Sequence, residues 1–142
     1  MSYRVRRIDP YWNKNPLLPV VALVGVLVGL LFVSREAFVP AALCGAVAGV
    51  AVFLATQPAV SAVMGVFGAV GGLMTFVLFP KPEVMGMSFA MRLLSAILFS
   101  LFYTVLMDGV ILLVAVLYNL FAGAVGLGGF SLDLEEGGEG GA

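Results

Sequence analysis

Long apolar runs separated by short polar breaks make up most of the chain. The first run covers residues 16–33 and ends at Ser34-Arg35-Glu36, and the second covers residues 37–56. The third covers residues 58–79 and ends at Pro80-Lys81-Pro82-Glu83. A helix rises about 1.5 Å per residue, so runs of this length reach roughly 27 Å or more and can cross the hydrocarbon core of a bilayer. The pattern therefore predicts transmembrane helices.

Prolines mark the expected helix starts. Pro16 and Pro19 fall in the first turn of the first run, and Pro40 falls near the start of the second. A proline costs little there because the first N–H groups of a helix have no partner within the helix. Pro58 leaves only a very short connection after the second run, so we expect the second and third helices to form a tight antiparallel hairpin.

The segment from Val84 to Gly129 allows two interpretations. In the first, residues 88–107 and 110–127 form two spans joined by a turn at Asp108-Gly109, a dipeptide common in turns. In the second, one span runs from Phe99 to Phe121 and holds Asp108 near its middle. An acidic residue at the centre of a span costs about 2.5–3.5 kcal/mol on insertion scales, so we favour the first interpretation. The predicted fold is thus an all-α, polytopic transmembrane helix bundle, with five spans favoured over four.

Composition supports this fold class. Hydrophobic residues make up 62% of the 142 residues and charged residues 11%. Soluble domains carry about 25% charged residues, so this chain could not cover a water-exposed surface and must face lipid. Residues 1–15 form a basic head, which we expect to stay cytoplasmic by the positive-inside rule, and nucleic-acid binding is not expected. Residues 131–142 are rich in Gly and Glu, and we expect a flexible acidic tail.

Aromatic and small residues indicate how the bundle sits and packs. Tyr11 and Trp12 lie beside Lys14 just before the first run, as an interfacial anchor would; the alternative is contact with the protein's own loops. Small residues at spacings of three or four occur in three consecutive runs, where they allow close approach of helices. The helix-packing residues expected on this basis are Gly25, Gly29, Ala41, Gly45, Gly49, Gly65, Gly68 and Gly72.

The residue types of most active sites are missing. The sequence has no histidine and one cysteine, Cys44, which removes the commonest general base and any cysteine-rich metal site. The serines have no histidine or lysine partner nearby in sequence. We therefore predict no catalytic, cofactor-binding or metal-binding residues, and no enzymatic activity.

Polar residues inside the apolar segments are the remaining functional candidates. Arg92, Thr104, Asp108 and Asn119 are the four that could form a polar pathway or an ion pair, with the last three on one face if residues 99–121 are a single helix. The simpler alternative places Arg92 at the headgroup boundary and Asp108 in a turn.

Two functions fit these observations. The first is a non-catalytic structural or accessory subunit of a larger membrane assembly, whose partners are the lipid bilayer and other membrane subunits or copies of itself. The second is a small oligomeric channel or transporter that uses Asp108 and Arg92. The expected location is a prokaryotic cell membrane or a virion membrane. A cleaved signal peptide is not favoured, because the first run is long and no small-residue cleavage site follows it.

Overall fold

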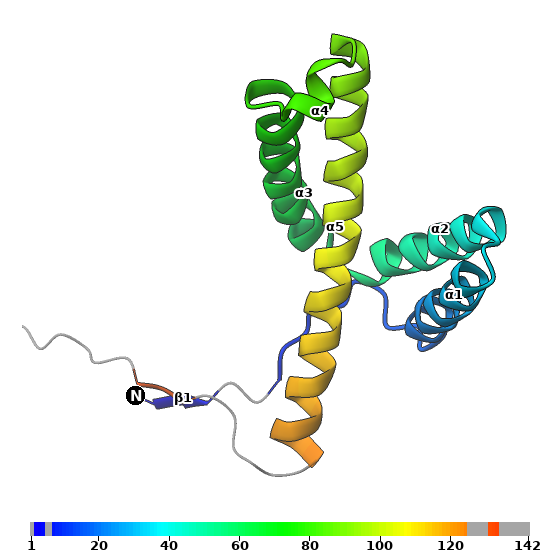
Figure 1. The fold of residues 1–142 in the computed structure, drawn as a ribbon. Coiled ribbons are helices and arrows are strands. Elements are labelled where there is room, and N and C mark those ends of the chain that lie inside the picture. Colours follow the sequence, from blue (N-terminus) through cyan, green and yellow to red (C-terminus); the bar gives the residue numbers. More distant parts are fainter. Residues whose placement is uncertain (1, 5–6, 125–130, 134–142) are drawn as a thin grey trace, which may run out of the picture. The chain divides into compact units, whose positions relative to one another are not determined.

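The computed structural model describes residues 2–4, 7–124 and 131–133, and most of them are helical (Figure 1). The helices of the first half are α1 (Leu17–Ser34), α2 (Phe38–Ala55) and α3 (Pro58–Leu73). A π-helical turn, η1 (Met74–Leu78), continues α3, and the one-turn helix α4 (Pro82–Met85) follows it. The second half consists of α5 (Phe89–Asn119) and a second π-helical turn, η2 (Leu120–Ala124). Two short strands, β1 (Ser2–Arg4) and β2 (Ser131–Asp133), complete the described elements.

Four of these helical segments are long and apolar enough to cross a membrane: Leu17–Ser34, Phe38–Ala55, Pro58–Leu78 and Phe89–Gly123. The prediction of an all-α transmembrane fold is confirmed. The first three spans begin and end within two residues of the limits predicted from the sequence, which were 16–33, 37–56 and 58–79.

The favoured division of the last segment into two spans is wrong. α5 runs without interruption through Asp108 and Gly109, so the turn predicted there is not formed and the four-span alternative is the one observed. A turn inside lipid would leave backbone groups without partners, whereas a continuous helix satisfies them all. The helix is also longer than the span from Phe99 that the alternative assumed, because it begins at Phe89.

α1 and α2 form a close helical pair through small residues. A Cβ atom added to Gly25 would lie 3.0 Å from the Ala48 Cβ, and one added to Gly29 would lie 3.5 Å from the Cys44 Cβ. The turn between the two helices contains Glu36, whose φ of 58° is in the left-handed region. The Ala37 N–H donates to the Phe32 carbonyl, and that bond closes a Schellman-type end of α1.

The hairpin predicted for the second and third spans is not formed. α2 pairs with α1, and α3 packs on α5. Thr56 and Gln57 are both extended, with ψ values of 145° and 133°, so the chain leaves α2 in a new direction before α3 begins. The N-terminal segment crosses this connection: the Gln57 N–H donates to Pro10 O at 2.9 Å and the Trp12 N–H donates to Ala55 O at 2.8 Å.

α3 and α5 touch backbone to backbone. A Cβ atom at Gly68 would lie 2.9 Å from the Ser100 carbonyl oxygen, and one at Gly72 would lie 2.6 Å from the Ala96 carbonyl oxygen. Glycine is therefore required at both positions for this approach. The last turn of the span widens into η1 just before Pro80, which has no N–H to continue the helix.

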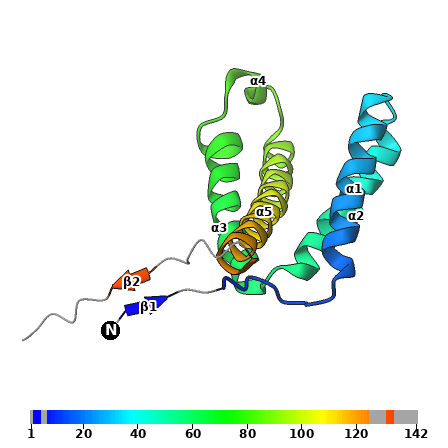
Figure 2. The same cartoon turned by 90° about the horizontal axis from the view of Figure 1, so that it is seen from below.

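The chain divides into two compact units, residues 10–112 and a second unit of residues 1–9 with 113–142. In the second unit, β1 and β2 pair antiparallel, with Tyr3 opposite Leu132 (Figure 2). The start of the tail, predicted to be flexible, is thus part of a strand; residues 134–142 lie outside the described residues. An even number of spans returns the chain to the side on which it began, as this pairing of the two ends requires.

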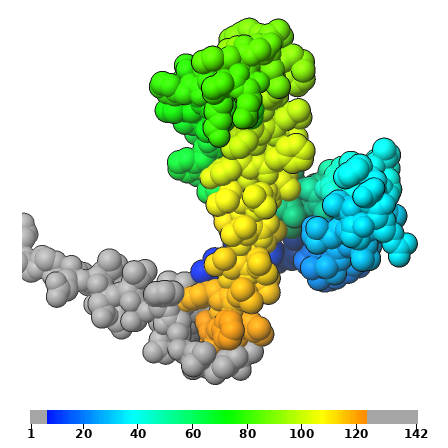
Figure 3. Space-filling model, in the orientation of Figure 1, coloured from blue at the N-terminus to red at the C-terminus, as the bar shows by residue number. Residues whose placement is uncertain are grey.

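Large side chains are mostly on the outside of the described chain. Its buried apolar residues are all alanines: Ala48, Ala51, Ala55, Ala96 and Ala115. Figure 3 shows the side chains of α5 standing at the surface over much of its length. Lipid or another protein, rather than a core of its own, must cover these residues.

Candidate functional site

A row of polar groups, here called the Asp108 seam, lies between α3 and α5. It consists of Ser61 and the Gly65 carbonyl on α3, with Ser100, Thr104 and Asp108 on α5. The α5 residues follow each other at intervals of four, which puts them on one face of the helix. Asp108 has 0% of its surface exposed and Thr104 has 5%, so these two residues are buried, whereas Ser61, Gly65 and Ser100 are half-buried.

Asp108 is the ionisable residue of the seam and lies at the end nearest the start of α3. The Ser61 hydroxyl donates to Asp108 Oδ2 at 2.5 Å, and this bond links α3 to α5. Asp108 Oδ1 is buried and has no hydrogen-bond partner within the described part of the chain. Buried carboxylate oxygens are normally satisfied, so this atom is the most unusual feature of the structure.

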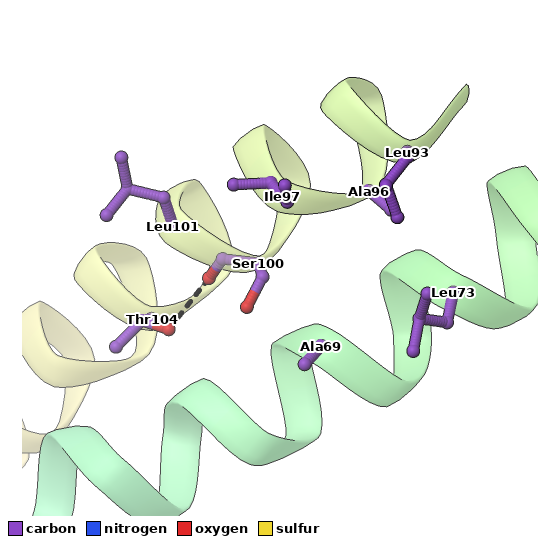
Figure 4. A pocket seen from close by; sticks show the side chains of 8 residues that line it. All are labelled: Ala69, Leu73, Leu93, Ala96, Ile97, Ser100, Leu101 and Thr104. Carbon is purple, nitrogen blue, oxygen red and sulfur yellow. Dashed lines mark hydrogen bonds between the residues drawn. The ribbon is translucent and has the colours of Figure 1, made fainter. Parts of the chain in front are cut away.

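The other hydroxyls of the seam bond to backbone. Thr104 Oγ1 donates to the Ser100 carbonyl at 2.7 Å, and Ser100 Oγ donates to the Gly65 carbonyl at 3.2 Å. Both serve as donors in these bonds and keep lone pairs free to accept. Figure 4 shows how Ser100 and Thr104 face α3 across a groove of about 370 Å³. The remaining residues lining the groove are apolar: Ala69, Leu73, Leu93, Ala96, Ile97 and Leu101.

The depth of the seam follows from α3. Ser61 comes three residues after Pro58, the first residue of that helix. Three residues of helix rise about 4.5 Å, so Ser61 and Asp108 lie one turn from the end of the span where Gln57 leaves it. The polar groups extend as far as Ser100, after which Ala96 and Gly72 form the contact. The row of polar groups therefore runs from the first turn of α3 to Ser100.

Arg92 does not belong to this site. Its Nε donates to the Met87 carbonyl at 3.1 Å and its Nη2 donates to the Met85 carbonyl at 2.5 Å, which ties it to the loop before α5. Sixteen residues of helix separate it from Asp108, a rise of about 24 Å. The ion pair considered for these two residues is not formed, and the placement of Arg92 at the headgroup boundary stays a prediction.

Asn119 is also engaged elsewhere. Within the second unit, its Nδ2 donates to the Ile8 carbonyl at 2.8 Å, and its Oδ1 accepts from the Ile8 N–H at 2.9 Å. The Asn119 amide thus satisfies both backbone groups of Ile8, as a neighbouring strand would. Of the four polar candidates, Thr104 and Asp108 are brought together, whereas Arg92 and Asn119 bind other groups.

The three expected anchor residues have different surroundings. Tyr11 is half-buried, forms a β-bridge with Thr56 and donates its hydroxyl to the Leu112 carbonyl at a long 3.4 Å. This matches the alternative of contact with the protein's own loops. The Trp12 side chain is 69% exposed, and Lys14 is exposed as well. Their placement at the headgroups remains a prediction.

Six of the eight expected helix-packing residues lie in two helix contacts, and Gly45 and Gly49 have other surroundings. Gly25, Gly29 and Ala41 lie in the α1–α2 contact, and Gly65, Gly68 and Gly72 lie in the α3–α5 contact. A Cβ atom at Gly49 would lie 3.5 Å from the Val105 side chain of α5, an ordinary contact. The backbone nitrogen of Gly45 would lie 4.0 Å from a Cβ atom at Gly29, but a Cβ atom at Gly45 itself would have nothing within 4 Å.

Ser61 and Ser100 were not among the polar candidates predicted from the sequence, although Ser61 begins the series of small residues in the third run. The interval of four that joins Ser100, Thr104 and Asp108 was visible in the sequence, but the partner of Asp108 lies 47 residues away on another helix. Among the described residues, no three Cys, Asp or Glu side chains come together as ligands for a metal ion. Comparison with known protein families, with characterised proteins and with solved structures finds no match for this chain.

Proposed function

We propose that this chain is a non-catalytic structural or accessory subunit of a larger membrane assembly. The observation that carries the proposal is the outward placement of nearly every large apolar side chain: among the described helices, the buried hydrophobic side chains are all alanines. Each helix contact involves small residues, so the chain offers broad apolar surfaces and encloses little space of its own. Such surfaces suit packing against other membrane helices.

α5 strengthens this proposal. It has 31 residues and a length of roughly 46 Å, whereas the hydrocarbon core of a bilayer is about 30 Å thick. Beyond Asp108 the helix stays apolar, with Leu113 and Leu117 exposed. A strong tilt in lipid would accommodate this excess length, and so would contact with other protein helices. A membrane assembly would provide such contact.

The test is the mass of the particle that contains the chain in its own membrane. After extraction with a membrane-solubilising polymer, native mass spectrometry should find the chain in a complex of defined composition. The double change Leu113→Ala and Leu117→Ala keeps the helix apolar but should release the chain from that complex. Leu23→Ala with Leu27→Ala, at exposed positions of α1, is the matched control. A chain found alone in both variants and in the wild type would refute the proposal.

A small oligomeric channel or transporter is the second candidate, and the buried Oδ1 of Asp108 favours it. Within the described chain, however, the seam gives way to apolar contacts beyond Ser100, so conduction would require several subunits. Purified protein in liposomes should then pass ions, and Asp108→Asn should abolish the flux. A lack of flux from the wild-type protein would eliminate this candidate.

The orientation proposed with either function places the N-terminus in the cytoplasm. The basic residues of the head support it through the positive-inside rule. With four spans, the acidic tail is then cytoplasmic too, on the same side as the head.

A further inference from the structure

Asp108 needs a positive partner that its surroundings do not provide. A carboxylate removed from water is costly unless a cation or a proton accompanies it. Residues 58–78, which make up α3 and η1, contain no ionisable side chain, and Arg92 is held by the carbonyls of Met85 and Met87. The other titratable groups on helices of this unit are Cys44 on α2, Glu83 on α4 and Tyr103 on α5, and Tyr11 reaches α5 at Leu112. None of these carries a positive charge.

The atoms gathered around Asp108 are oxygens. Oδ1 of Asp108 is buried and unpartnered, Oδ2 accepts from Ser61, and Thr104 lies one turn back on the same helix with its hydroxyl proton directed to Ser100. Carboxylate and hydroxyl oxygens suit small hard cations, whereas copper or zinc would favour nitrogen or sulfur. With one negative charge and two neutral hydroxyls, a monovalent ion brings the group to neutrality.

We propose that Asp108, Ser61 and Thr104 form a binding site for a sodium-sized monovalent cation that exchanges with a proton on Asp108. Binding of the cation releases that proton, and the carboxyl group becomes a carboxylate paired with the ion. The site does not depend on the role proposed above, since a bound ion can simply hold α3 to α5.

Infrared difference spectroscopy of the full chain in liposomes tests the exchange directly. Sodium chloride is added at constant ionic strength, with choline chloride as the reference salt. Sodium should remove the carbonyl band of a protonated carboxylic acid, and this change should be absent from Asp108→Asn. A wild-type spectrum that sodium does not alter would overturn the proposal, as would a sodium effect that persists in Asp108→Asn.

The hydroxyl ligands are tested by the sodium concentration that gives half of the spectral change. Ser61→Ala should raise that concentration about tenfold, as expected for the loss of one contact to a charged group. Ser95→Ala, a change on α5 away from the seam, should leave it unaltered. Circular dichroism and gel filtration of each variant establish that it is folded. Equal sodium dependence in a folded Ser61→Ala variant would remove Ser61 from the site.

Ion selectivity and transport are separate measurements. Potassium should be much less effective than sodium, because a compact site with one carboxylate and two hydroxyls suits the smaller ion. Equal potency of the two would contradict a site of this size. Sodium binding without flux across the liposome would support the site together with the accessory role, and binding with flux would support the site together with the transporter.

Discussion

Ser61 Oγ lies 2.5 Å from Asp108 Oδ2, and this single bond joins two membrane helices across 47 residues of sequence. It lies at the first turn of α3 and in the interior of α5. Glycines at positions 68 and 72 then bring the same two helices into backbone contact further along. The pair is therefore fastened by a polar contact near one end and by close packing beyond it.

Replacing Asp108 should separate its hydrogen-bonding role from its charge. Asp108→Asn keeps an oxygen that can accept from Ser61, so the helix pair should retain most of its stability. Asp108→Leu removes the acceptor and should cost about 1 kcal/mol, the usual size of an interhelical hydrogen bond in a membrane. Unfolding in mixed detergent micelles, followed by circular dichroism, measures both. Equal stability of the two variants would mean that the contact with Ser61 contributes nothing.

Substitutions of glycine should depend on the distance to the neighbouring helix. A Cβ atom at Gly72 would lie 2.6 Å from the Ala96 carbonyl oxygen, so Gly72→Ala must push α3 away from α5. We expect a loss of about 1–3 kcal/mol, the cost of overpacking a close contact. The free energy of unfolding in mixed micelles measures the loss.

Gly45→Ala is the matched control for that change. A Cβ atom at this position would have no neighbour within 4 Å, and alanine favours a helix over glycine by up to about 1 kcal/mol. The variant should be unchanged or slightly more stable. If Gly45→Ala and Gly72→Ala changed the free energy of unfolding equally, the close approach of α3 and α5 at Gly72 would not contribute to stability.

The sequence predicted most of the fold because each early span is bounded by strong local signals. Pro58 begins a helix one residue after Gln57, and Pro80 prevents its continuation, so the limits of α3 with η1 could be read directly. The thickness of the bilayer core favours spans of about 20 residues, and the first three spans, of 18, 18 and 21 residues, agree with their predicted limits to within two residues.

Asp108 is the position where local reasoning failed. Asp-Gly is a turn signal in water, and a central acidic residue is costly in lipid, so both arguments favoured a break. The partner that reduces this cost, Ser61, is remote in sequence, and no periodic pattern connects the two residues. The prediction of which helices pair failed for a similar reason. A short loop suggests that the two helices it connects pack against each other, but the extended Thr56 and Gln57 allow α3 to pack on α5 instead.

Glu36 should be a site where one substitution stabilises the protein. Its φ of 58° is a left-handed conformation that costs a residue with a Cβ about 1 kcal/mol and glycine very little. Glu36→Gly should therefore raise the free energy of unfolding by up to that amount, and Glu36→Val should lower it. Arg35→Gly is the control, because φ at this residue is −102° and glycine relieves no strain there. Stabilisation by Arg35→Gly as large as that by Glu36→Gly would contradict this explanation.

The two ends of the chain should lie on the same side of the membrane. Tyr3 and Leu132 are opposite each other in the β1–β2 pair, which is compatible with four spans and incompatible with five. In a Cys44→Ala background, single cysteines at positions 3, 132 and 57 should react with a membrane-impermeant maleimide from one side. Cysteines at positions 36 and 83, in the connections at the other ends of the helices, should react from the opposite side. Labelling of positions 3 and 132 from opposite sides would show that α5 is interrupted within the bilayer. The contact of Asp108 with Ser61 would then have to be abandoned as well, because in this structure Asp108 lies in the interior of an uninterrupted helix.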